Sequence, residues 1–229
     1  MNLTGVFINA ICVFAAGILG SIFKKGIPER IKRTLMLALG LCVLYVGIDG
    51  IVAGMDAVLL VLSVSIGAFI GEAIDFDDKF SRLGRYVESR MPKNEDNIAD
   101  GFVSATLFVC VGAMAIAGGI ESGTKGTYNT FLAKSCIDTL VIFIMAATKG
   151  FGCSLAAIPT LLYELLITLF SGAIAHIATA EVINSMSVIG SLLIVGIALN
   201  LMEITRIKIG NFILAPFVPV AVYLIGKLF

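Results

Sequence analysis

The stretch FLAKSCIDTLVIFIMAATKG, residues Phe131–Gly150, places two charged side chains inside a long apolar run. Lys134 and Asp138 are four residues apart, so in a helix they share one face. If the run crosses a membrane, each charge costs about 2.5–3.5 kcal/mol on insertion scales. Lipid could not compensate for that cost. Both side chains must therefore face protein or water, which makes them candidates for a functional site.

The composition of the whole chain indicates that this run does cross a membrane. The chain has 229 residues, of which 59% are hydrophobic and 14% are charged. A soluble domain carries about 25% charged residues, so too few remain here to cover a surface facing water. Apolar runs long enough to span the hydrocarbon core recur along the sequence. Because they are continuous rather than alternating, they indicate helices and not a β-barrel.

The sequence predicts an all-α, polytopic membrane protein with eight transmembrane helices. The expected spans are Leu3–Phe23, Ile31–Val52, Ala57–Ile74, Phe102–Gly119, Thr130–Thr148, Ser154–Ile177, Ile183–Met202 and Asn211–Leu228. Thirteen of the 16 Lys and Arg residues fall in alternate connections, chiefly 24–34 and 75–100. The positive-inside rule places those connections in the cytoplasm and both termini outside.

The first and last thirds of the chain resemble each other. Gly17 matches Gly172, Gly40 matches Gly190, and the VGI sequence at 46–48 matches the one at 195–197. Spans 1–3 and 6–8 would run in opposite directions, which predicts an inverted repeat of residues 1–74 and 154–229. Inverted repeats are typical of secondary transporters. Chance similarity between apolar sequences is the alternative.

Two segments separate the proposed repeats, namely residues 75–100 and the span pair 101–153. In the first, Phe76, Phe80, Leu83, Val87 and Met91 recur at helical spacing. This pattern predicts a basic amphipathic helix on the inner membrane surface, in contact with membrane lipid. It serves either as a plain connector or as a lipid-binding element.

Four further polar residues accompany Lys134 and Asp138 as candidates for a substrate or ion pathway. Glu164 lies ten residues into the span that begins at Ser154, which places it deep in the bilayer. A carboxyl group at that depth favours its protonated form and could exchange a proton. Asn9 and Asn200 are weaker candidates, because amides often only bond across helices. Ser135 neighbours Lys134, but a Ser–Lys dyad would need the two side chains to approach each other in space. A structural ion pair is the alternative role for Lys134 and Asp138.

Glycines and a proline mark places where a helix could break or pack closely. Gly112, Gly118 and Gly119 lie in the segment CVGAMAIAGGIESG, and Pro159 lies five residues before Glu164. A helix that breaks near Gly118 and Gly119 would free backbone groups to bind a ligand. Close helix packing through small residues is the alternative. Pro159 predicts a kink or a break, because it lacks a backbone donor.

The sequence argues against several other classes of function. The net charge is zero, which gives no case for nucleic acid, and His176 is the only histidine, so we expect no metal site and no cofactor. The five cysteines form no CxxC pair and suit small apolar side chains. The GxxxxGK[ST], HExxH and GxSxG motifs are absent, so we do not expect an enzyme. A homodimer would enclose more interior than one chain and stays open.

The segments FVCVGAMAIAGGIESG and FLAKSCIDT resemble a bacterial membrane family catalogued as domain of unknown function five-five-four, or YdfK/YqgA-like. GVFINAICVFAAGILGS and LALGLCVLYVGIDG extend the resemblance over essentially the whole chain. It implies a bacterial inner-membrane protein and no particular substrate. The positions that match the family are Gly112, Met114, Gly118, Lys134, Ser135 and Asp138.

The chain departs from that family at three positions. Thr127 stands near a usual acid, Thr139 stands near a usual glycine, and Glu164 replaces a usual amide. A proton carrier at position 164 would therefore not be general to the family. Taken together, the sequence predicts a small secondary transporter of an ion or small solute. An ion channel, or a scaffold or sensor without transport, is the alternative.

Overall fold

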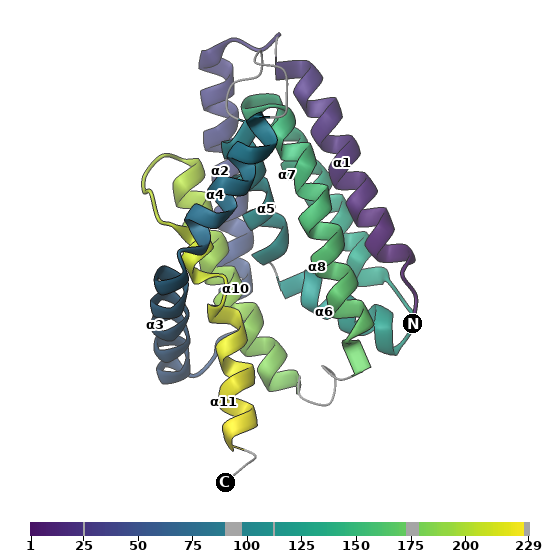
Figure 1. The fold of residues 1–229 in the computed structure, drawn as a ribbon, viewed down its shortest axis with the longest axis vertical. Coiled ribbons are helices and arrows are strands. Elements are labelled where there is room, and N and C mark those ends of the chain that lie inside the picture. Colours follow the sequence, from purple (N-terminus) through teal and green to yellow (C-terminus); the bar gives the residue numbers. More distant parts are fainter. Residues whose placement is uncertain (25, 90–97, 112, 173–178, 227–229) are drawn as a thin grey trace.

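A computed structural model describes residues 1–24, 26–89, 98–111, 113–172 and 179–226, and within these ranges all regular structure is helical. The α-helices are α1 (Thr4–Lys24), α2 (Glu29–Ile51), α3 (Ala57–Ile74), α4 (Phe76–Ser89), α5 (Ile98–Val111), α6 (Ala113–Thr124), α7 (Asn129–Lys149), α8 (Ala157–Leu169), α10 (Ala180–Leu201) and α11 (Val218–Gly226) (Figure 1). The 3₁₀ turns are η1 (Phe151–Ala156), η2 (Ile209–Phe212) and η3 (Ala215–Phe217).

The predicted all-α, multi-pass fold is confirmed. Seven helical segments of the described chain are long and apolar enough to cross a membrane, and a bent pair, α5 with α6, makes up to eight. Two of the seven segments are composite. In Phe151–Leu169 the turn η1 continues into α8, and in Ile209–Gly226 the turns η2 and η3 lead into α11. The chain is therefore a membrane protein. It has an eighth span if the bent pair of α5 and α6 crosses the membrane as a single span.

Helices α1 and α7 lie side by side and run in the same direction (Figure 1). Gly5 of α1 faces Phe131 near the start of α7, and Gly20 faces Ala146 near its end. A Cβ atom at Gly5 would lie 2.8 Å from the Cβ atom of Phe131. One at Gly20 would lie 2.9 Å from the Cβ atom of Ala146 and closer still to the carbonyl oxygen of Phe143, so both positions are tighter than side chains normally pack. The small residues of α1 thus bring its backbone close to the helix that carries Lys134 and Asp138.

Helices α2 and α10 pack against each other in opposite directions. Gly40 faces Met202, whereas Gly47, further along α2, faces Val195, which is earlier in α10. In the same way α3 runs opposite to the C-terminal segment, since Gly67 faces Ala215 whereas Gly71, further along α3, faces the earlier residue Asn211. These relative directions agree with the order of spans expected from the Lys and Arg distribution.

The fourth expected span is not a straight helix. Segments Ile98–Cys110 and Met114–Thr124 are bent by 56° relative to each other. Gly112 itself lies outside the described residues. The break therefore does not fall at Gly118 and Gly119, which are inside α6.

Helix α4 coincides with the predicted amphipathic segment and ends at Ser89. It begins directly after Asp75, whose φ of 53° reverses the chain at the end of α3. Gly84 of α4 packs on Ala99 of α5, and Phe80 adds to the central core. Met91 lies outside the described residues, and the position of α4 on a membrane surface stays a prediction.

Large apolar side chains cover much of the outside, particularly on α2 and α3. Phe69 of α3 is 77% exposed and Tyr45 of α2 is 70% exposed. In water such a surface would be unfavourable, but in a bilayer it faces acyl chains at no cost. The membrane lipid is therefore the natural surrounding of these faces.

Candidate functional site

Three helices bring four polar side chains together in the interior. Asn9 comes from α1, Lys134 and Asp138 come from α7, and Glu164 comes from α8. All four side chains are buried, with 0–3% of their surface exposed. We call these residues the buried quartet. The close packing of α1 on α7 places Asn9 level with Lys134, because Asn9 lies four residues after Gly5 and Lys134 lies three residues after Phe131, where the two helices touch.

Hydrogen bonds and ion pairs link all members of the buried quartet. Lys134 forms an ion pair with Asp138 on the same face of α7, and its Nζ atom lies 3.6 Å from Oε1 of Glu164. The Asn9 amide donates to Oδ2 of Asp138 at 3.2 Å and to Oε1 of Glu164 at 2.7 Å. The predicted neighbours Lys134 and Asp138 are therefore joined by Glu164 and Asn9 in one network.

The network leaves two acceptors unused. Oε2 of Glu164 and Oδ1 of Asn9 are buried, and neither has a hydrogen-bond partner among the described residues. An unpaired buried acceptor costs about 1–3 kcal/mol. The quartet also contains two carboxyl groups and one ammonium group. It therefore lacks both a donor and a positive charge.

A cavity of about 200 Å³ reaches the quartet at Lys134 and Asp138. It lies between α2, α10 and the bend of α5 and α6. Its lining residues are Val46, Asp49, Gly50, Phe108, Val109, Met114, Lys134, Ile137, Asp138, Ser187, Ser191 and Ile194. We call this space the outer cavity, because Asp49 lies near the end of α2 that the charge distribution places outside.

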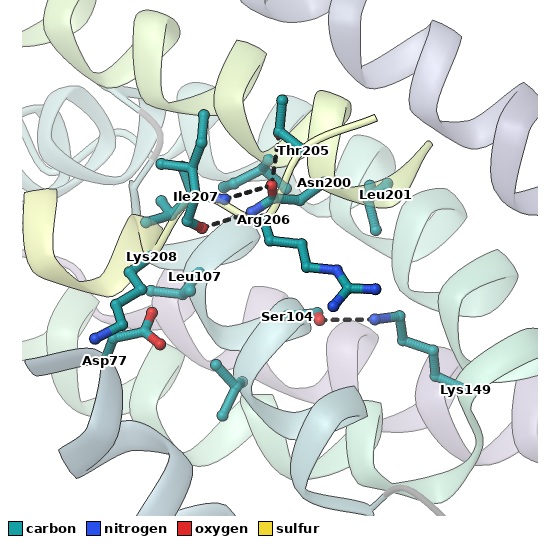
Figure 2. Close-up of a pocket in the computed structure, with 13 residues that line it drawn as sticks. Asp77, Ser104, Leu107, Lys149, Asn200, Leu201, Thr205, Arg206, Ile207 and Lys208 are labelled. Atoms are coloured by element: carbon teal, nitrogen blue, oxygen red, sulfur yellow. Dashed lines mark hydrogen bonds between the residues drawn. The ribbon is translucent and has the colours of Figure 1, made fainter. Parts of the chain in front are cut away.

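A second space of about 290 Å³ lies at the opposite ends of α7 and α10. We call it the inner pocket (Figure 2). Asn200 belongs here and not to the buried quartet. Its side chain donates to the carbonyl oxygen of Ile207 at 2.7 Å and accepts from Thr205 at 2.8 Å. Asn200 therefore holds the loop after α10.

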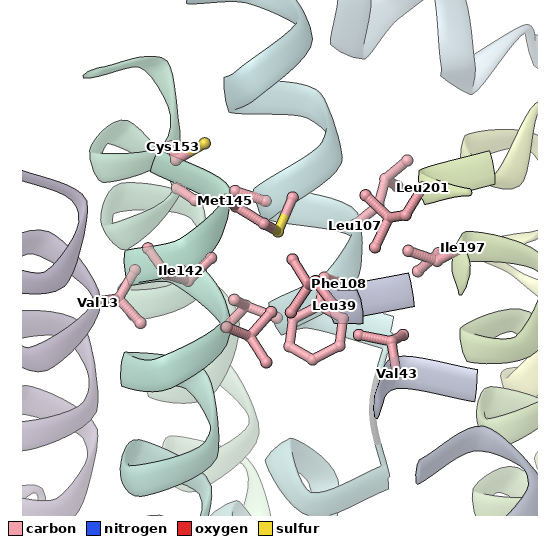
Figure 3. Close-up of a cluster of buried hydrophobic side chains, with 14 of the residues drawn as sticks. Val13, Leu39, Val43, Leu107, Phe108, Ile142, Met145, Cys153, Ile197 and Leu201 are labelled. Carbon is pink, nitrogen blue, oxygen red and sulfur yellow. The ribbon is translucent and has the colours of Figure 1, made fainter. Parts of the chain in front are cut away.

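An apolar layer separates the outer cavity from the inner pocket (Figure 3). Phe108 and Ile194 line the outer cavity, whereas Leu107 and Ile197 line the inner pocket, and all four belong to one packed cluster. Leu39 and Val43 of α2 and Met145 of α7 also belong to this cluster. No continuous polar path therefore joins the two spaces through the described residues of this cluster.

The remaining candidates have local structural contacts. Ser135 donates its hydroxyl group to the carbonyl oxygen of Phe131, one turn earlier in its own helix, at 2.7 Å. Gly118 packs on the ring of Phe131, and Gly119 packs on Ile167 of α8. Gly118 and Gly119 thus mark close packing in this structure.

Pro159 lies in the first turn of α8, where a backbone donor has no partner within the helix. The expected kink or break near Pro159 is replaced by a change from the 3₁₀ turn η1 to the α-helix at Ala157. Among the described residues no group of three or more His, Cys, Asp and Glu side chains could hold a metal ion.

Sequence reasoning missed the residues that shape the two spaces. Ser187 and Ser191 of α10 line the outer cavity, and Arg206 lines the inner pocket. Serine is common in membrane helices, so no single-sequence signal distinguishes these two. Ser191 packs against Gly50, a position where α2 lacks a side chain, and only the structure shows this contact.

Comparison with known proteins gives the family. The sequence profile described as "Protein of unknown function (DUF554)" matches residues 4–224. The chain belongs to this family. Similar members are the "Uncharacterized membrane protein YdfK" of Bacillus subtilis (strain 168), 27% identical over 219 residues, and the "Uncharacterized protein YqgA" of Escherichia coli (strain K12), 27% identical over 214 residues.

The DUF554 relatives match along nearly their whole length. The alignment covers 94% of this chain and 93% of YdfK, and 90% of each chain for YqgA. No solved structure matches. The resemblance expected from the glycine-rich and Lys134–Asp138 segments is therefore confirmed. The family places the chain among membrane proteins, but the names of its members state no activity.

Proposed function

We propose that this protein is a small secondary transporter that moves an ion or small solute across the bacterial inner membrane in exchange for, or together with, a proton. The buried quartet at the base of the outer cavity carries this proposal. Charged groups at such depth are costly, and in membrane proteins they commonly mark ion or proton pathways. The substrate would enter between α2, α10 and the α5–α6 bend.

The charge balance of the buried quartet supports a proton as the coupling ion. With every group ionised, Lys134, Asp138 and Glu164 together carry one net negative charge. A proton on Glu164 makes the quartet neutral, which a poorly solvated interior favours. Oε2 of Glu164 is the oxygen without a partner among the described residues, so it is free to take that proton.

The apolar layer favours a carrier over a channel. A channel requires a continuous path for ions, whereas a carrier closes one side while the other is open. Phe108 and Ile194 close the outer cavity from the inner pocket in this structure. Movement of α10 against α5 would open this closure, since both helices line both spaces.

The packing of α2 on α10 supports the inverted repeat as the basis of that movement. A two-fold axis in the membrane plane requires the paired helices to meet in opposite directions at equivalent residues. The matching VGI segments meet in this way, because a Cβ atom at Gly47 would lie 2.9 Å from the backbone nitrogen of Val195. Spans 1–3 and 6–8 would then rock about this crossing.

The experiment uses purified protein in liposomes loaded with a pH-sensitive dye. Gradients of Na⁺, K⁺, Li⁺ and small metabolites are imposed one at a time, and the internal pH is followed. We expect one class of solute to drive saturable proton movement that is lost in Asp138→Asn. Lys125→Gln, which changes a charge outside the quartet and both spaces, is the matched control.

Three results would overturn the proposal. Unitary currents in planar bilayers would identify a channel. Proton movement that is equal in the wild type and in Asp138→Asn would remove the quartet from the pathway. If no solute drives flux, and Asp138→Asn changes only the stability and leaves cellular solute levels unchanged, the protein is a scaffold or sensor.

A further inference from the structure

The inner pocket gathers positive charge at the membrane boundary. Lys149 of α7, and Arg206 and Lys208 of the loop after α10, line it, against one acidic residue, Asp77 of α4. Lys208 lies 3.7 Å from Glu72, and Lys149 lies 2.7 Å from Asp100. In the described part of the chain, Arg206 has no ion pair, unlike Lys149 and Lys208.

The loop that carries Arg206 is held in place by Asn200. Besides its bonds to Thr205 and to the Ile207 carbonyl oxygen, the Asn200 carboxamide oxygen accepts the Ile207 backbone N–H at 2.9 Å. The residues on both sides of Arg206 are therefore fixed to the end of α10. Figure 2 shows the guanidinium group extending across the pocket toward Ser104 and Lys149.

The opposite wall is also fixed and offers further donors. The Lys149 ammonium group bonds to Asp100 at 2.7 Å and to the Ser104 hydroxyl group at 2.9 Å. An ammonium group has three donors, so one remains for a ligand. An anion between the Arg206 guanidinium group and this remaining Lys149 donor would attract both groups.

We propose that the inner pocket is a binding site for a phosphate group. The planar guanidinium group of Arg206 can bind two phosphate oxygens at once, and Lys149 supplies a point charge from the other wall. The apolar side chains of Val103 and Leu107 line the same pocket and suit the carbon chain of an organic phosphate. The observations behind this site are separate from those behind the transport proposal, because none of the residues that line the inner pocket belongs to the buried quartet.

Asp77 provides an internal test of charge. Its carboxylate lines the pocket and accepts the Gly210 backbone N–H at 3.2 Å. An asparagine could keep this bond through its carbonyl oxygen while it removes the negative charge. Loss of Arg206 should therefore weaken phosphate binding, whereas Asp77→Asn should strengthen it.

Two arms distinguish a soluble phosphate from a lipid headgroup. In the first, inorganic phosphate is titrated into the purified full-length protein in a neutral detergent, with chloride at constant ionic strength. In the second, protein is released from nanodiscs of phosphatidylglycerol or phosphatidylcholine, and retained lipid is counted by native mass spectrometry. Arg206→Gln is compared with Arg82→Gln, which removes an exposed arginine of α4 that does not line the pocket.

We expect Arg206→Gln to lose at least tenfold in phosphate affinity, or to lose retained phosphatidylglycerol, whereas Arg82→Gln keeps both. Asp77→Asn should raise the affinity several-fold in the same arm. The arm that responds identifies the source of the phosphate group. If Arg206→Gln and Arg82→Gln are equal in both arms, or if neither phosphate nor phosphatidylglycerol binds the wild type, the site does not exist.

Discussion

The side-chain nitrogen of Asn9 in α1 lies 2.7 Å from Oε1 of Glu164 in α8, although 155 residues separate them in the chain. The same nitrogen also donates to Asp138 of α7. The Asn9 amide therefore joins α1, α7 and α8, so its removal should lower the stability of the protein measurably.

Replacement of Asn9 by alanine should destabilise the protein. Two buried carboxyl groups would each lose a donor, and an unsatisfied buried group costs about 1–3 kcal/mol. The measurement is thermal unfolding in detergent. Asn184→Ala, which removes a hydrogen bond to the carbonyl oxygen of Gly54, is the control and should cost less. Equal effects would show that the three-helix junction contributes no more than a surface bond.

Lys134 and Asp138 should be strongly coupled in a double-mutant cycle. Lys134→Met alone leaves two acidic groups without their cation, and the loss of one member of a buried pair costs about 3–5 kcal/mol. Asp138→Asn combined with Lys134→Met removes both charges and should be less destabilising than the sum of the single changes. Additive effects on unfolding would mean that Lys134 and Asp138 do not stabilise each other.

Glu164→Gln should separate proton movement from folding, if the proposed transport is correct. Glutamine fills the same volume and can still accept from Asn9, but it carries no exchangeable acidic proton. We expect proton flux in liposomes to fall at least tenfold while the unfolding temperature changes little. Glu181→Gln at the start of α10 is the control. Unchanged flux in Glu164→Gln would exclude Glu164 as the proton site.

A side chain at Gly47 should force α2 away from α10. Its Cβ atom would lie 2.8 Å from Val195 and 2.9 Å from the Val195 backbone nitrogen. Gly47→Val is expected to cost about 1–3 kcal/mol through overpacking. Gly172→Val is the control, because no atom of the described residues lies within 4 Å of a Cβ atom at Gly172. If both variants unfold at the same temperature, the α2–α10 crossing is not tightly packed.

Asp77 should make stability depend on pH. Burial raises the pKa of its carboxyl group, more than the hydrogen bond from Gly210 and the charge of Lys208 lower it. Because the folded state binds this proton more tightly, the contribution of Asp77 is most favourable below the unfolded pKa, about 3.9. It is lost as pH rises through the folded pKa. Asp77→Asn should therefore gain stability relative to the wild type between about pH 4 and neutrality, measured by unfolding midpoints.

The absence of this pH dependence at Asp77 would also be informative. If the difference between Asp77→Asn and the wild type does not change with pH, the bond to Gly210 and the attraction of Lys208 offset the burial of the carboxyl group. Asp78→Asn provides the comparison on the same helix. Desolvation favours a higher pKa for Asp78, but hydrogen bonds from Arg82 and Arg85 lower it, so its pH dependence has the opposite sign.

The sequence by itself determined the membrane class, the helical fold and the order of the spans. These follow from local quantities, namely the length of each apolar run and the position of Lys and Arg residues. It also determined that Lys134, Asp138 and Glu164 must be hidden from lipid, because the cost of a charge in hydrocarbon does not depend on the fold.

Only the tertiary structure decided which helices hide these side chains. The junction at Asn9 depends on how closely α1 approaches α7, and the outer cavity depends on a bend between α5 and α6. At Gly118 and Gly119 the sequence left a break and close packing both open, because glycine permits either. Contacts between residues far apart in the chain choose between these outcomes, and no local pattern encodes them.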